Sequence, residues 1–306
     1  MVSSRAVLAA LVSFGFAGLA LAGDTAADAQ LRAAIGKIET MVGDKAARFS
    51  ASQTLAELGQ LAAQAKANPA ELRRIHMMSG VVEHKRWQGA VTAQMHDVEP
   101  MLAGQTRDAF AKAFAIAVPA NADPEREARD HYMMGEVAEA LHDMALSAKH
   151  YGLAVTWAEK ASGLSQDHKL AMRVQYGFAL HETGLIKEAL AVNAAALKDG
   201  EARYGADSYE LRAVLTNIAQ NLHKLGRGAE AEPYLVRCRK LANANGDVAK
   251  EQDMLFQLGV LAFELGRPAD ARAFMNERIA LLSAHNEPEL LASAREDLAI
   301  LEEKLK

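Results

Sequence analysis

The sequence predicts an all-α protein in which antiparallel helix hairpins stack on one another behind an N-terminal helical region. Half of the residues are hydrophobic but only 6% are aromatic, so alanine and leucine supply most of the apolar surface, and both favour helix. Nearly every segment after Gly23 shows helical periodicity, and no alternating strand pattern is found. In addition, one set of spacings recurs along the C-terminal half.

Residues 1–22 are predicted to be a signal peptide. Arg5 precedes an apolar core over Ala6 to Leu19, and Ala20-Leu21-Ala22 provides a small-x-small cleavage pattern. A second such pattern ends at Ala29, so cleavage after either alanine is possible. The alternative is that this short apolar stretch remains as a membrane anchor, and membrane contact is expected only in that case. We therefore expect a periplasmic or secreted protein.

The charge and the cysteine content of the chain argue against a nucleic-acid partner and against an intramolecular disulfide. The net charge of −5 is mild, and no basic cluster with interleaved aromatic residues is present, so nucleic acid is not an expected partner. Cys238 is the single cysteine of the chain, which excludes an intramolecular disulfide. Stability must then come from packing.

Residues 23–122 read as several amphipathic helices, over about 26–42, 52–67, 69–84 and 105–117. They form diverged repeats, a cap or a small helical domain. Proline punctuates the helix starts: Asn68-Pro69 and Asp123-Pro124 each place a capping residue before a first-turn proline, and Pro288 opens a last helix. We expect the hairpins over 123–285 and a capping helix over 286–306.

The hairpins share a frame in which a small residue, a leucine or alanine, a glycine and an alanine follow at fixed intervals. The glycine would end the first helix, and the small residues would let the two helices approach closely. A fourth, looser copy over 151–161 places Lys149 at the turn, so the predicted turn spacings are 35, 42 and 40. The three closest copies are Gly177-x2-Leu180-x3-Gly184-x4-Ala189, Ala219-x2-Leu222-x3-Gly226-x4-Ala231 and Gly259-x2-Ala262-x3-Gly266-x4-Ala271.

This frame resembles tetratricopeptide repeats, whose unit is a two-helix hairpin of about 34 residues. The stretch from Tyr204 to Pro233 is similar to the longer repeats of kinesin light chains and their bacterial relatives. The resemblance implies a right-handed superhelical array whose first helices line a concave groove that binds peptides.

The resemblance also implies which residues face the groove, counted back from each turn glycine. The residue nine positions before each of the three turn glycines carries a side-chain amide. Such amides can hold the backbone of an extended peptide, because an amide both donates and accepts hydrogen bonds. Lysines that grip a terminal carboxylate in one family variant are replaced by Ala171, Ala213 and Asp253. The expected groove residues are Gln175, Phe178, His181, Asn217, Gln220, His223, Phe256, Gln257 and Phe263. The alternative is that these residues have only a structural role, in which the amides face solvent while the phenylalanines pack between hairpins.

The expected function is a non-enzymatic scaffold or adaptor that binds a protein or peptide, with no cofactor and no catalytic or metal-binding residues. No nucleophile elbow, zinc helix or phosphate-binding loop is present. Two alternatives remain. Residues 76–150 hold six of the ten histidines and many methionines, ligands that suit cuprous copper in a metal-handling protein. A helical enzyme with its site in residues 23–122 is the other.

Overall fold

A computed structural model describes residues 26–43 and 49–305, and these residues form α-helices with short 3₁₀ turns and no strand. The all-α prediction is therefore confirmed. The predicted signal segment 1–22 lies outside the described residues. None of the described helices is both long and apolar enough to cross a membrane. The helices are α1 (Ala26–Gly43), α2 (Ala51–Gln64), α3 (Pro69–Thr92), α4 (Glu99–Phe114), α5 (Pro124–Ala140), α6 (Met144–Lys160), α7 (Gln166–Glu182), α8 (Ile186–Tyr204), α9 (Arg212–Lys224), α10 (Gly228–Ala244), α11 (Val248–Glu264), α12 (Pro268–Ala284) and α13 (Pro288–Lys304).

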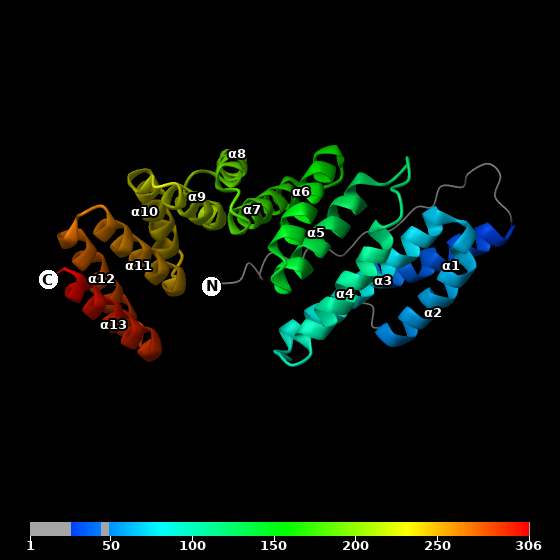
Figure 1. The fold of residues 1–306 in the computed structure, drawn as a ribbon, viewed down its shortest axis with the longest axis horizontal. Coiled ribbons are helices and arrows are strands. Elements are labelled where there is room, and N and C mark those ends of the chain that lie inside the picture. Colours follow the sequence, from blue (N-terminus) through cyan, green and yellow to red (C-terminus); the bar gives the residue numbers. More distant parts are fainter. Residues whose placement is uncertain (1–25, 44–48, 306) are drawn as a thin grey trace. The chain divides into compact units, whose positions relative to one another are not determined.

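Helices that follow one another pack together as neighbours from α1 to α6 and again from α8 to α13 (Figure 1). Their contacts divide the chain inside α7 into an N-terminal unit, up to Met172, and a C-terminal unit from Arg173 onward. The domain boundaries expected at 122/123 and 285/286 stay predictions.

The proline-marked helix starts are present. The side chain of Asn68 accepts a hydrogen bond from the backbone N–H of Glu71 at 3.3 Å, and Asp123 accepts one from Glu125 at 3.0 Å. Proline follows each of these caps, where it replaces an N–H that the helix leaves unpaired. The predicted range 69–84 ended too early, because α3 continues to Thr92. The predicted range 105–117 began and ended too late, because α4 starts at Glu99 with Pro100 in its first turn and ends at Phe114.

Each repeat hairpin turns at a residue in the left-handed conformation. Gly184, Gly226 and Gly266 have φ of +81°, +71° and +70°. The residue after each glycine donates its N–H to the carbonyl five residues earlier, as Arg227 does to Leu222 at 2.9 Å. This is the Schellman motif, which satisfies carbonyls at a helix end. The predicted glycine turns are thus in place.

The predicted fourth turn at Lys149 was wrong, because Lys149 lies inside α6. The turn is at His142, which has φ of +59°, and Asp143 donates its N–H to Ala138 at 2.9 Å. Counted from His142, Gly184, Gly226 and Gly266, the steps are 42, 42 and 40 residues. Histidine adopts positive φ more readily than most residues, so the turn forms without the glycine on which the frame was anchored.

A glycine in the first helix lets the second helix come close. A Cβ added to Gly135, Gly177 or Gly259 would lie 2.5, 2.3 or 2.8 Å from the side chain of Tyr151, Asn193 or Met275, respectively. In each hairpin the small residue is seven before the turn and its neighbour is nine after it. The α3–α4 hairpin also brings a glycine of the first helix against a large side chain of the second, but Gly80 and Phe110 lie farther from its left-handed turn at Gln94 than the corresponding residues of the repeats.

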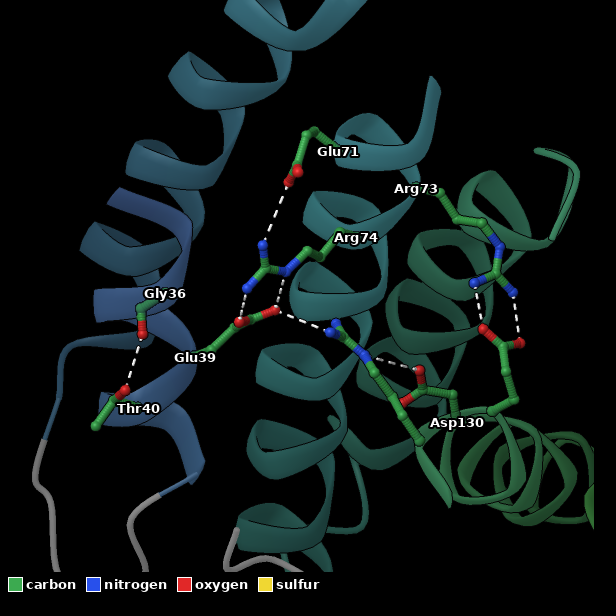
Figure 2. Close-up of polar contacts among 9 residues, drawn as sticks. Gly36, Glu39, Thr40, Glu71, Arg73, Arg74 and Asp130 are labelled. Carbon is green, nitrogen blue, oxygen red and sulfur yellow. Dashed lines mark hydrogen bonds and ion pairs between the residues drawn. The ribbon is translucent and has the colours of Figure 1, made fainter. Parts of the chain in front are cut away.

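Ion pairs tie α1, α3 and α5 together in the N-terminal unit (Figure 2). The fully buried carboxylate of Glu39 accepts hydrogen bonds from Arg74 Nε at 2.7 Å and Arg126 Nη1 at 2.9 Å. Arg73 pairs with Glu127 through two hydrogen bonds of 2.5 and 2.7 Å. Asp130 lies beside this cluster, and burial raises its pKa to about 7.

We predict that Gly226→Ala lowers the free energy of unfolding by about 1–2 kcal/mol, because alanine is strained in the left-handed conformation. A steric clash does not contribute, since nothing lies within 4 Å of a Cβ added to Gly226. Gly104→Ala is the control. It also meets nothing within 4 Å but lies inside α4, where alanine stabilises a helix by about 0.5–1 kcal/mol. Equal shifts in the urea midpoint for both variants would contradict the prediction.

We predict that Asp130 makes a pH-dependent contribution that lowers the stability of the N-terminal unit as the pH rises from about 4 to about 7. Across this window the folded state keeps a proton that the unfolded state has released, because burial raises the pKa of Asp130 to about 7. The contribution of Asp130 to the free energy of unfolding then falls by at most about 1.4 kcal/mol per pH unit and levels off above about pH 7.

Asp130→Asn should remove this slope, and urea unfolding at several pH values measures it. The buried His131–His150 pair acts in the opposite direction, because burial lowers the two pKa values to about 3 and about 4, so its contribution is lost as the pH falls below about 6.5. The variant should keep this acid-side loss. Parallel stability curves for the variant and the wild type would exclude the role assigned to Asp130.

Candidate functional site

A pocket of about 120 Å³ lies between α9, α10 and α11 in the C-terminal unit. Its floor is apolar, formed by Ala219 of α9, Ala231 and Leu235 of α10, and Val260 and Leu261 of α11. Four of the nine expected groove residues complete the lining: Gln220, His223, Phe256 and Gln257. The structure thus places four of the nine expected groove residues around one pocket.

The spacing of residues along the two first helices creates this arrangement. Gln220 and His223 are three apart on α9, and Phe256, Gln257 and Val260 lie within one turn of α11, so each set shares a face. Gln220 is exposed and Gln257 half-buried. Neither amide makes a side-chain hydrogen bond within the described chain, so both keep their donors and acceptors for a ligand.

The other expected amides lie outside this pocket. Asn217 donates from Nδ2 to the backbone carbonyl of Val174 at 3.3 Å, which joins α9 to α7. This donor is therefore engaged within the protein. Gln175 is half-buried on α7 and does not line the pocket.

The two expected groove histidines connect successive hairpins. His181 Nδ1 lies 2.7 Å from Asn221 Oδ1, which links α7 to α9. His223 Nε2 lies 2.5 Å from Glu264 Oε2, which links α9 to α11 at the edge of the pocket. Both bonds span about 40 residues of sequence, so a residue-by-residue reading of one helix does not reveal them.

Two of the three expected phenylalanines lie away from the pocket. Phe263 packs against the core cluster of Ala262 and Met275, as the packing alternative had it, and Phe178 is half-buried on α7. Phe256 contacts the same cluster and also lines the pocket.

Arg278 of α12 contacts the Phe256 ring, and this contact was not expected from the sequence. Its guanidinium lies 4.9 Å from the centre of the Phe256 ring, within the range of a cation–π contact. Gln252 accepts from its Nε at 2.9 Å and Asp297 from its Nη1 at 2.6 Å. These bonds fix the guanidinium, and with it one wall of the pocket. The pocket alanines did carry a sequence signal, since Ala219 and Ala231 are marks of the repeat frame.

The histidine-rich region 76–150 brings two of its histidines into direct contact. His131 and His150 face each other with their Nδ1 atoms 2.9 Å apart, and His131 stacks on Phe114 with ring centres separated by 4.3 Å. Met77 and Met134 are core residues next to Phe114. In the part of the chain that the structure describes, no group of three or more His, Cys, Asp or Glu residues is placed to hold a metal ion.

Cys238 is buried in α10. Burial raises the pKa of its thiol, which disfavours the thiolate that a nucleophile requires.

No protein-family model matches the sequence, and no curated protein is similar to it. Solved structures share its fold. BtubC (BKLC) from P. vanneervenii is 15% identical, with 86% of this chain and 93% of that chain covered and a TM-score of 0.54. Aspartyl phosphate phosphatase F from Bacillus subtilis is 10% identical, with coverages of 91% and 70% and a TM-score of 0.57.

A putative kinesin light chain with nearly identical TPR-like repeats, from Podosopora anserina, is 14% identical over 71% of this chain and 97% of that chain, with a TM-score of 0.44. At these identities the likenesses concern the fold alone. Together with the hairpin turns and the close-packed helix pairs, the likenesses to BtubC and to aspartyl phosphate phosphatase F identify the architecture. The chain has the tetratricopeptide-like repeat fold that its sequence predicted.

Proposed function

We propose that this protein is an exported, non-enzymatic interaction module that binds an extended segment of another polypeptide at the α9–α11 pocket. The observation that carries the proposal is the combination of an apolar cavity with two amides, Gln220 and Gln257, that have no hydrogen-bond partner within the described chain. Apolar pockets with a few orienting polar groups are the usual form of a binding site. Tetratricopeptide-like arrays offer such surfaces repeatedly.

The size of the pocket favours one aliphatic side chain of the partner. A closed apolar cavity of about 150 Å³ accommodates benzene. The pocket here is about 120 Å³, which suits a leucine, isoleucine or valine side chain better than an indole. The amides of Gln220 and Gln257 would bond to the partner's backbone on either side of this anchor.

Export and the absence of catalysis are part of the proposal. The charged, apolar and small-x-small pattern over residues 1–22 supports a periplasmic or secreted location. The polar residues that line the pocket are two amides and one histidine, which is hydrogen-bonded to Glu264. None of these lining residues is a nucleophile next to a base, as covalent catalysis would require. One protein of similar fold is named a phosphatase, which describes that protein and brings no activity to this one.

We predict that changing both Gln220 and Gln257 to alanine abolishes capture of the partner from an envelope extract. Loss of two backbone-orienting amides should weaken binding at least tenfold, at about 1.4 kcal/mol per factor of ten. Capture by the immobilised full chain, read by quantitative mass spectrometry, measures this effect.

Gln60→Ala is the matched control, because Gln60 is an exposed amide on α2, away from the pocket. Circular dichroism should show the same helical content for all three proteins. Equal recovery of every captured protein by the double variant and the control would refute the proposed function.

A further inference from the structure

Asp253 of α11 is a carboxylate one helical turn before two residues that line the pocket. It precedes Phe256 by three residues and Gln257 by four, so all three side chains share one face of the helix. Asp253 is half-buried and accepts a hydrogen bond of 2.5 Å from Gln252 Nε2, and no ion pair within the described chain includes it. Burial raises its pKa, while Lys250 and Arg278 act in the opposite direction from a distance.

Neither Lys250 nor Arg278, two cations that act on Asp253, forms an ion pair with it within the described chain, and Arg278 is engaged elsewhere. Arg278 is buried and hydrogen-bonded to Asp297 and Gln252, and it stacks on Phe256. On the other side of the pocket, Glu264 contacts His223 but no lysine or arginine of the described chain. Along α11 the pocket-lining residues Phe256 to Leu261 therefore lie between two carboxylates that have no lysine or arginine ion-pair partner within the described chain, which favours a cationic ligand over an anionic one.

Helix geometry sets where such a cation would be. Asp253 and Gln257 are separated by four residues, or about 6 Å along the helix axis at about 1.5 Å per residue. An extended peptide advances about 3.3 Å per residue, so two residues span nearly the same distance. A side chain two residues away from the one in the pocket points to the same side of the peptide.

We propose that the ligand is an extended peptide segment in which a leucine, isoleucine or valine enters the pocket and a lysine or arginine two residues away forms an ion pair with Asp253. The inference rests on the proposed function, since it assumes that the pocket takes a side chain. It adds a basic residue at a fixed spacing to the partner. It also explains an acidic residue where a carboxylate-gripping groove would need a cation.

Selection of phage-displayed random peptides on the immobilised full chain tests this inference. The wild type should enrich peptides with a basic residue two positions before or after an aliphatic one. Asp253→Lys should instead enrich an acidic residue at that spacing. Glu296→Lys is the matched control, because Glu296 is exposed on α13 and should leave the wild-type preference unchanged. A synthetic peptide of the enriched sequence should bind Asp253→Asn about tenfold more weakly than the wild type.

The outcomes separate the two proposals. Enrichment of aliphatic peptides without a basic preference, or a preference that survives Asp253→Lys, overturns the role of Asp253 and leaves the pocket as a binding site. If the wild type enriches nothing beyond what the variant with alanine at Gln220 and Gln257 enriches, the proposed function fails and this inference fails with it.

Discussion

The close approach of two antiparallel helices at one small residue is the constraint on which this architecture depends. In the hairpins that turn at His142, Gly184, Gly226 and Gly266, the first helix carries a glycine or an alanine seven residues before the turn, and a larger side chain lies nine residues after it. In three of these hairpins the small residue is glycine. In the α9–α10 hairpin the same pair is Ala219 and Leu235, and both line the pocket. The pocket is thus a variation of the contact that builds these four hairpins.

The turns could be predicted where the sequence used the residue that fits the backbone best. Gly184, Gly226 and Gly266 mark their turns because glycine reaches positive φ without strain. His142 and Gln94 make the same turn without that signal. At these positions the hydrogen bonds of the helix end and the packing of the hairpin hold the conformation, and neither can be read from one residue type. The incorrect turn at Lys149 arose because apolar spacings in α6 were matched without a glycine to fix the register.

The assignment of groove residues stays a prediction, and the sequence could support it only one helix at a time. Gln220 and His223 of α9 and Phe256 and Gln257 of α11 line one pocket, because side chains three and four apart share a face with Val260 or with each other. The register of residues along one helix could not show that the Asn217 side chain donates a hydrogen bond to the carbonyl of Val174, about 40 residues earlier. Arg278 was missed for the same reason, since its contacts with Phe256 and Asp297 exist only after α11, α12 and α13 have packed.

Individual carboxylates of this chain differ in how their charge is balanced, and this difference bears on the proposed recognition. Two buried acids of the N-terminal unit are matched by arginines, with Glu39 between Arg74 and Arg126 and Glu127 on Arg73. Such pairs satisfy one another and leave little for a ligand, because a buried carboxylate with its hydrogen bonds made gains nothing from a new partner. Asp253 in the C-terminal unit is partly withdrawn from water and accepts a hydrogen bond from Gln252, but no ion pair within the described chain includes it. A cationic side chain of a bound peptide would recover the solvation that this carboxylate has lost, whereas the same side chain at a solvated surface pair would gain little. Partner selection by charge is therefore expected at the pocket, where the protein has left an electrostatic interaction incomplete.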